Sequence, residues 1–335
     1  MEDIFSYRRE ESFNAKEGLL KDWKITVQPN ISVAGWPADA GSKALADFTA
    51  LEDATIIDRL KNAGADICGA TKMSEFGFGI KGSKAGEALR KKEVNAELVL
   101  DLMGEARLAA MRANVFGFKP GYGIISRFGL IGLIPSMEAC GILSSEVSLI
   151  GEILKIIAGA DGKDFCLPDE SLLPAVEIIP GKTKVGVIRE AVQGLSEKEN
   201  EFFTSQLGKI KEAGWKIKEL TFSEYDLCQS VHNIIGAVEA SSCAGRYDSV
   251  RYGKRAPGTK NWNEMYLQSR GAFFGLLIKS YLFQGAYFQF EKYSDYESAC
   301  RIRKHLVREI EKLTAQTDFL ITPVRMPKNA STPLS

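Results

Sequence analysis

Histidine is almost absent from this sequence, with two in 335 residues, and the six cysteines include no CxxC pair. A histidine-rich metal centre and a Cys–His nucleophile therefore lack their usual residues, and we expect no metal or other cofactor. Scattered cysteines of this kind are typical of buried, reduced thiols in the cytoplasm. No apolar run approaches eighteen residues, and the charged first residues lack the apolar stretch of an export signal. We expect a cytoplasmic protein without a membrane span.

An excess of either charge is also missing, because 43 lysines and arginines balance 43 aspartates and glutamates. Without a basic excess, direct nucleic-acid binding is not expected. Hydrophobic residues make up 45% of the chain, which is enough for one large or two smaller α/β domains. The residue pattern predicts helices over 53–63, 196–213 and 293–314 and strands over 184–190 and 215–222. Such alternation is typical of a sheet covered by helices on both faces.

The stretch 98–130 has two halves with different patterns. In 98–113 apolar residues recur every three or four positions, and strong helix formers precede it, so residues from about 88 to 110 are predicted to be mainly helical. The half 115–130 contains four glycines and a proline, which suits a tight path through a core. One more long helical region is predicted over 265–290.

Residues 117–131, GFKPGYGIISRFGLI, resemble the GLKPTYGRVSRFGL-type segment of the amidase signature family. Residues 24–45, 239–256 and 318–324 resemble further segments of that family in the same order. Within the family, the resemblance is greatest to the A subunits of aspartyl/glutamyl-tRNA amidotransferases. It implies an α/β amidase-signature fold, with a central mixed twisted β-sheet covered by helices on both faces.

The resemblance covers about residues 23–325, so it implies a single amidase-like domain over 1–335, truncated at both ends relative to the family. Residues 1–22 are expected to form an N-terminal helical segment, and residues 326–335 a C-terminal tail. Loss of elements that normally cover the sheet predicts an exposed apolar face. We therefore expect a homodimer or a protein partner.

The positions that carry catalysis in the family are altered here. The resemblance places Gln28 at the catalytic lysine, Ser83 at the serine that relays the proton, and Glu105 at the nucleophilic serine. A glutamine amide has no useful basicity and cannot activate a nucleophile. A methionine also replaces one glycine of the segment that supplies oxyanion-hole N–H groups in the family, a loss that typically costs on the order of 10²–10³ in rate.

Other positions around the family's pocket are partly retained. Next to Glu105, three residues match the Asp, Gly and Arg of the family's GSDTGGSIR motif: Asp101, Gly104 and Arg107. The substrate-binding arginines are replaced by Ser280 and Tyr281. Three charged residues of the segment 239–256 either form an ion network or touch a ligand: Arg246, Asp248 and Arg251.

Three functions fit these residues. The first is a catalytically inactive amidase-like protein that serves in binding or assembly as a subunit, with an unknown small-molecule ligand if it has one. The second is an amide hydrolase with a remodelled active site that uses Glu105 or Ser83 as its nucleophile. The third is one chain of a glutamyl-tRNA(Gln) amidotransferase complex, which explains the retained scaffold but not the altered catalytic positions.

Overall fold

The computed structural model describes residues 3–10, 17–79, 81–168, 179 and 181–324. The chain divides into two compact units. The first unit comprises Met1–Leu173, Glu239–Phe283 and Lys328–Ser335, and the second comprises Pro174–Val238 and Gln284–Pro327. In the part of the chain that is described, no helix is long and apolar enough to cross a membrane.

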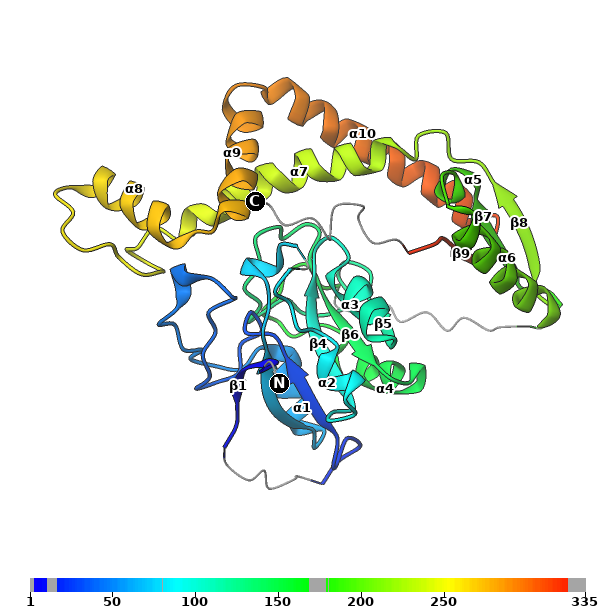
Figure 1. The fold of residues 1–335 in the computed structure, drawn as a ribbon, viewed down its shortest axis with the longest axis horizontal. Helices are drawn as coiled ribbons and strands as arrows, with labels where there is room; N and C mark the ends of the chain where they lie inside the picture. Colours follow the sequence, from blue (N-terminus) through cyan, green and yellow to red (C-terminus); the bar gives the residue numbers. More distant parts are fainter. Residues whose placement is uncertain (1–2, 11–16, 80, 169–178, 180, 325–335) are drawn as a thin grey trace. The chain divides into compact units, whose positions relative to one another are not determined.

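The first unit is built on a six-stranded mixed sheet with the strand order β1-β3-β2-β4-β6-β5 (Figure 1). Strands β2, β3 and β4 run parallel to one another, whereas β1, β5 and β6 pair antiparallel with their neighbours. The strand bounds are β1 (Phe5–Arg8), β2 (Lys24–Val27), β3 (Asp66–Thr71), β4 (Ala96–Asp101), β5 (Phe116–Phe118) and β6 (Ala139–Ser144).

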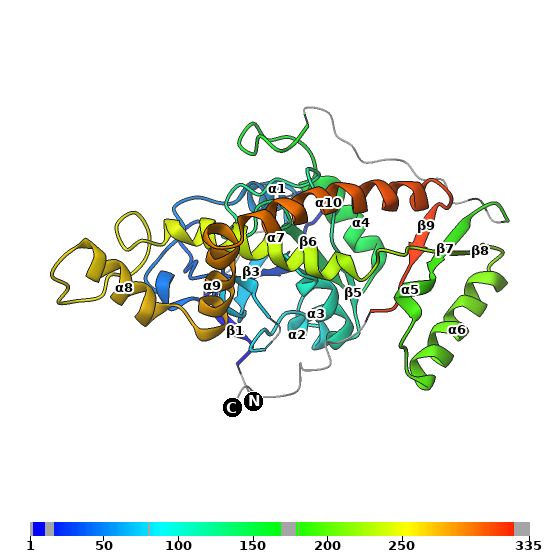
Figure 2. The ribbon, with the colours of Figure 1, turned by 90° about the horizontal axis from the view of Figure 1, so that it is seen from above.

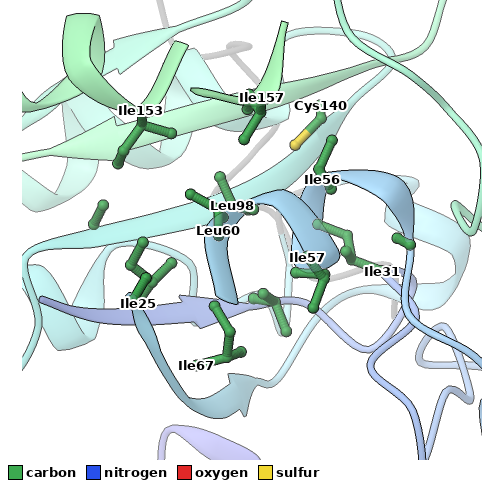
Figure 3. Close-up of a cluster of buried hydrophobic side chains, with 14 of the residues drawn as sticks. Ile25, Ile31, Ile56, Ile57, Leu60, Ile67, Leu98, Cys140, Ile153 and Ile157 are labelled. Atoms are coloured by element: carbon green, nitrogen blue, oxygen red, sulfur yellow. The ribbon is translucent and has the colours of Figure 1, made fainter. Parts of the chain in front are cut away.

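Helices cover both faces of this sheet. One face packs against α1 (Thr55–Asn62) and α4 (Val147–Ile157), and the other against α2 (Glu87–Arg90) and α3 (Glu105–Ala113). Figure 3 shows the first of these contacts, in which isoleucine and leucine side chains from the strands and from the two helices meet: Ile25, Ile67, Leu98, Ile56, Ile57, Leu60, Ile153 and Ile157. Each such buried side chain stabilises the fold by roughly 1.5–3 kcal/mol. This arrangement confirms the predicted fold class.

A second core in the first unit joins short 3-10 turns to helices from late in the sequence. The turns are η1 (Lys43–Leu45), η2 (Glu75–Gly77) and η3 (Ala244–Arg246), and the helices are α8 (Trp262–Phe273) and the start of α9 (Leu276–Phe290). The ring of Phe76 lies 5.0 Å from that of Tyr247 and 6.2 Å from that of Phe274. These aromatic contacts tie the segment 239–256 to the sheet unit.

The second unit contains a parallel three-stranded sheet with the order β8-β7-β9 (Figure 2). Its elements are β7 (Lys184–Ile188), α5 (Arg189–Val192), α6 (Glu197–Glu212), β8 (Lys216–Leu220), α10 (Tyr293–Thr314) and β9 (Phe319–Ile321). Helix α7 (Leu227–Cys243) begins in this unit and ends in the first. Helix α6 begins with a capping box, in which Ser196 and Glu199 each bond the backbone N–H of the other, a pairing that fixes the start of the helix.

The prediction of a mainly helical stretch from 88 to 110 is wrong. Residues 96–101 form strand β4, and only Glu87–Arg90 and Glu105–Ala113 are helical. All six residues of β4 are buried, and the strand pairs with β2 on one side and β6 on the other. A strand covered on both faces has no apolar/polar alternation, so its pattern is easily mistaken for that of a buried helix.

Two further differences concern residues 1–22 and 265–290. Phe5–Arg8 forms an edge strand instead of the predicted helix, because Ile4 and Phe5 are buried against the sheet. The predicted long helix is interrupted between α8 and α9, where the N–H of Gly275 donates to Glu75 at 2.8 Å. The tail over 326–335 lies outside the described residues.

Candidate functional site

Buried polar side chains collect on the α3 face of the sheet, and three of them lie at the carboxyl ends of the parallel strands: Gln28, Thr71 and Asp101. Pairing between β2 and β4 sets Thr26 beside Glu97, and Thr71 of β3 donates its hydroxyl to Glu97 at 2.5 Å. Gln28 follows β2 and Asp101 ends β4, and both are almost fully buried. The carboxyl ends of parallel strands are where α/β sheets commonly bind ligands. This region is therefore the candidate site.

Glu105 is the first residue of α3, and its carboxylate turns back over the turn that precedes the helix. Its Oε2 accepts hydrogen bonds from the backbone N–H of Leu102 at 2.8 Å and of Met103 at 2.7 Å. Gly104 makes this turn possible with φ 110°, a value that other residues rarely adopt. Burial raises the pKa of Glu105 to about 7; the charge of Asp101 adds to this rise, and the N–H of Met103 opposes it. The carboxylate thus uses two N–H donors that would otherwise be free to bind an anion.

Asp101 and Arg107 form an ion pair with two hydrogen bonds next to Glu105. The two guanidinium nitrogens Nε and Nη2 of Arg107 lie 3.2 and 3.0 Å from the Asp101 carboxylate, which also accepts the N–H of Gly104 at 2.8 Å. Burial alone would lower the pKa of Arg107, but its hydrogen bond with Asp101 raises it. The sequence predicted Asp101, Gly104 and Arg107 as neighbours of the site, and the structure brings them together there.

Lys119 adds a second cation to this group. Burial lowers the pKa of Lys119, and the nearby charge of Arg107 lowers it further, whereas Asp101 and Glu105 oppose the change. A lysine needs a lowered pKa to serve as a base at neutral pH. Structural ion-pair networks also shift pKa values, so the shift alone does not assign a catalytic role to Lys119. Sequence reasoning did not single out this residue.

Ser83 is not brought to Glu105. Its carbonyl oxygen accepts a hydrogen bond from Arg112 at 3.4 Å, and its hydroxyl accepts one from the N–H of Ala85 at 3.4 Å. Arg112 lies seven residues beyond Glu105 in α3, which corresponds to about 10 Å along the helix axis. The Ser83 backbone therefore lies beside the far end of the helix that Glu105 begins.

The two residues at the family's substrate arginines differ in their surroundings. The Ser280 hydroxyl donates to the carbonyl of Leu277 at 2.9 Å, within its own helix. The Tyr281 ring packs edge-on against Phe78 at 5.0 Å. Burial raises the pKa of Tyr281, and the charge of Glu105 raises it further, which places this tyrosine near the site. The structure thus brings Tyr281, but not Ser280, towards Glu105.

Two of the three remaining predicted residues, Arg246 and Arg251, line a separate cleft of about 480 Å³ in the first unit. Asp248 accepts the N–H groups of Val250 and Arg251, both at 2.9 Å, and pairs with the Arg251 side chain at 3.3 Å. Arg246 donates from Nε to the carbonyl of Cys243 at 3.1 Å. Both arginines line the cleft, which shares no lining residue with the Glu105 group (Glu105, Asp101, Arg107 and Lys119).

Two buried carboxyl groups were missed from sequence. Glu97 accepts the Thr71 hydroxyl and the N–H of Gly86, and burial raises its pKa to about 7. Glu138 accepts the N–H of Ile134 at 3.2 Å, and burial again raises its pKa to about 7. Glu97 is the one charged residue in the apolar run AELVL. Assigning this run to a buried strand would have predicted a buried carboxyl group at Glu97. Among the described residues, no group of three or more metal-binding side chains is present.

Known proteins are similar to this chain in sequence and in fold. The family described as Amidase matches residues 3–87 and 104–332. The A subunit of glutamyl-tRNA(Gln) amidotransferase from Natronomonas pharaonis is 31% identical over 336 residues, which cover 92% of this chain and 79% of that protein. The protein of the same name from Lactobacillus johnsonii is 30% identical, over 93% of this chain and 71% of that protein.

Solved structures agree on the fold. The crystal structure of the A subunit of glutamyl-tRNA(Gln) amidotransferase from Thermotoga maritima superposes with a TM-score of 0.77 at 22% identity, over 96% of this chain and 71% of that one. The family match leaves out residues 88–103, the segment that contains Glu97 and Asp101. Since the match covers nearly all of the remaining chain, this protein belongs to the amidase family.

Proposed function

We propose that this protein is an amidase-family member that does not hydrolyse amides and serves in binding or assembly as a subunit. The observation that carries this proposal is the position of the Glu105 carboxylate. It stands where the resemblance places the nucleophile, and it accepts the N–H groups of Leu102 and Met103.

This geometry opposes acyl transfer in two ways. An oxyanion that forms during amide cleavage needs free N–H donors, and each donor lost typically costs on the order of 10²–10³ in rate. Here a carboxylate already occupies two such donors, and its negative charge would repel an oxyanion. Gln28, at the position of the base, is 3% exposed and has no basic group to take up a proton.

A role within a larger complex is supported by the relatives and by the surface of α9. The curated relatives are named as A subunits of an amidotransferase, so those proteins work with other chains. Along α9, aromatic side chains are left exposed, including Phe283, Tyr287 and Phe290. Exposed aromatic residues of this kind are enriched where proteins bind one another. The partner is a second copy of this chain or a different protein, and a cytoplasmic location stays a prediction.

A remodelled hydrolase is the second candidate, because the pKa of Glu105 lies near 7 and Lys119 is close by. A carboxyl group with such a pKa is divided between its acid and base forms at neutral pH and suits proton transfer. In this candidate Glu105 acts as a base or nucleophile without Ser83.

The test is an amide screen on the purified chain. Glutamine, asparagine and aryl amides are incubated with the wild type and with Glu105→Gln, and release of ammonia or arylamine is followed. We expect no turnover by the wild type above that of the variant, and no labelling by a serine-directed fluorophosphonate. Turnover that disappears in Glu105→Gln would establish the second candidate, and stoichiometric labelling of Ser83 would overturn both proposals.

A further inference from the structure

The cleft beside the segment 239–256 is lined by two arginines, Arg246 and Arg251. Unlike Arg107 in the Glu105 group, neither is held by two bonds to a buried carboxylate in the described part of the chain. The Arg251 side chain is 67% exposed, and a single bond of 3.3 Å joins it to Asp248. Arg246 donates a hydrogen bond from Nε to the backbone carbonyl of Cys243. Each guanidinium keeps donors with which to bind an anion.

The loop that carries Arg251 is held in place by its own hydrogen bonds. Asp248 fixes the turn by accepting two backbone N–H groups, and Ser249, at φ 64°, donates its hydroxyl to the carbonyl of Lys254 at 2.9 Å. The N–H of Lys254 in turn donates to the carbonyl of Ala44 at 2.8 Å, which attaches the loop to η1. Arg251 is therefore presented from an ordered loop, and less conformational entropy is lost when it binds a ligand.

Beneath the arginines the cleft is apolar. Aliphatic and aromatic side chains from η1, from the segment after it, from the glycine-rich stretch and from the end of η3 line it: Leu45, Phe48, Leu51, Leu130, Ile131 and Tyr247. Leu51 is 91% exposed and Tyr252 51% exposed at this cleft, so apolar surface faces water there. The volume of about 480 Å³ falls within the range of small-molecule sites, roughly 300–1,000 Å³.

The nearby acidic groups do not cancel both arginines. Asp248 is paired with Arg251, and Asp47 pairs with Lys254 at 3.2 Å. Glu239 is bound by the hydroxyl and the N–H of Ser136. Glu138 is buried, and its pKa of about 7 leaves it partly protonated at neutral pH. A positive charge therefore remains at the cleft.

We infer that this cleft binds a small organic acid with a flat apolar body, whose carboxylate is held by Arg246 and Arg251 and whose body packs on Phe48 and Tyr247. Planar carboxylates match the fork of donors on a guanidinium, which is why the head group is assigned as a carboxylate. The apolar lining favours an aromatic or aliphatic acid over inorganic phosphate, which has no apolar body to bury. The inference is independent of the proposed function, because it uses none of the Glu105 group.

Fluorine NMR of 4-fluorobenzoate, titrated with the full-length chain, tests this inference. We expect saturable line broadening by the wild type, and weaker binding by about tenfold in Arg246→Gln and in Arg251→Gln, because each loses a charge-assisted hydrogen bond. The matched control is Arg301→Gln, which removes an exposed arginine of α10 and should bind like the wild type. Glu105→Gln should also bind like the wild type.

Two further probes complete the test. Neutral 4-fluorobenzyl alcohol should bind at least about tenfold more weakly than the acid, since it cannot pair with the arginines. Inorganic phosphate should not displace the acid at equal concentration. The inference is overturned by absence of broadening, by equal binding in Arg246→Gln and Arg301→Gln, or by loss of binding only in Glu105→Gln. Melting curves that match the wild type establish that the arginine variants are folded.

Discussion

The Glu105 group and the Arg246–Arg251 cleft contain the same kinds of charged side chain but use them differently. At the first, Arg107 makes two bonds to the buried Asp101, and Glu105 bonds two N–H groups. At the second, Arg246 donates to the carbonyl of Cys243, Arg251 pairs with Asp248 through a single nitrogen among the described residues, and both arginines are exposed. Charged groups that pair with one another inside the protein are not available to a ligand, whereas a guanidinium that keeps unused donors can bind one. The N–H donors and charges around Glu105 are therefore bonded to one another, while the arginines of a different surface of the same unit keep donors for a ligand.

The largest effect on the free energy of unfolding should come from Glu97, which lies on the same face of the sheet as the Glu105 group. Its pKa is raised from 4.5 to about 7, so the folded protein holds this proton more tightly than the unfolded chain does. The stabilisation is full below about pH 4.5 and is lost as pH rises to about 7, a change on the order of 3 kcal/mol. Glu97→Gln, which cannot titrate, should show a shallower fall in the free energy of unfolding over this window.

Urea unfolding at several pH values between 5 and 8 measures this effect. Glu152→Gln is the control, because Glu152 is half exposed on α4 and pairs only with Lys155 in the described part of the chain. Equal slopes for the wild type and Glu97→Gln would show that the buried carboxyl does not govern the pH dependence.

A smaller effect on the free energy of unfolding is expected when the ion pair between Arg107 and Asp101 is removed. Arg107→Ala leaves Asp101, which is fully buried, with only the N–H of Gly104 as a partner among the described residues. We expect a loss of about 2 kcal/mol in the free energy of unfolding; a fully buried pair would cost more, but the Arg107 side chain is itself half exposed. Chemical denaturation gives this value, and Arg107→Lys, which keeps the charge, should lose less. A loss below about 0.5 kcal/mol would mean that this pair does not hold the closed site.

The smallest effect on the free energy of unfolding is expected at the Arg246–Arg251 cleft. Arg246→Ala should change the free energy of unfolding by less than about 0.5 kcal/mol, because the arginine is exposed and its Nε donates to the carbonyl of an adjacent turn rather than to a buried carboxylate. The same denaturation measurement provides the comparison with Arg107→Ala. If both variants lost about 2 kcal/mol, the two regions would not differ in the way described.

Much of the fold follows from the sequence where amphipathic patterns and end signals are strong. Helix α1 ends before Gly64, and α10 covers residues 293–314 as its pattern predicts. Strand β4 was missed because it is buried on both faces and therefore lacks alternation. The positions of Gln28 and Glu105 followed from short motifs along the chain. Glu97 joins Thr71 only through the pairing of strands far apart in sequence, which no local pattern reveals.

The central claim is that the Glu105 carboxylate occupies the N–H groups of Leu102 and Met103, and amide NMR tests it most directly. The ¹H and ¹⁵N shifts of these two backbone amides are followed from pH 5 to pH 9 in the wild type and in Glu105→Gln. We predict that both amides titrate with a midpoint near pH 7 in the wild type, because ionisation of Glu105 strengthens both bonds, and that the titration is absent from Glu105→Gln. Amide shifts that do not change with pH in the wild type, or that titrate identically in the variant, would contradict the claim.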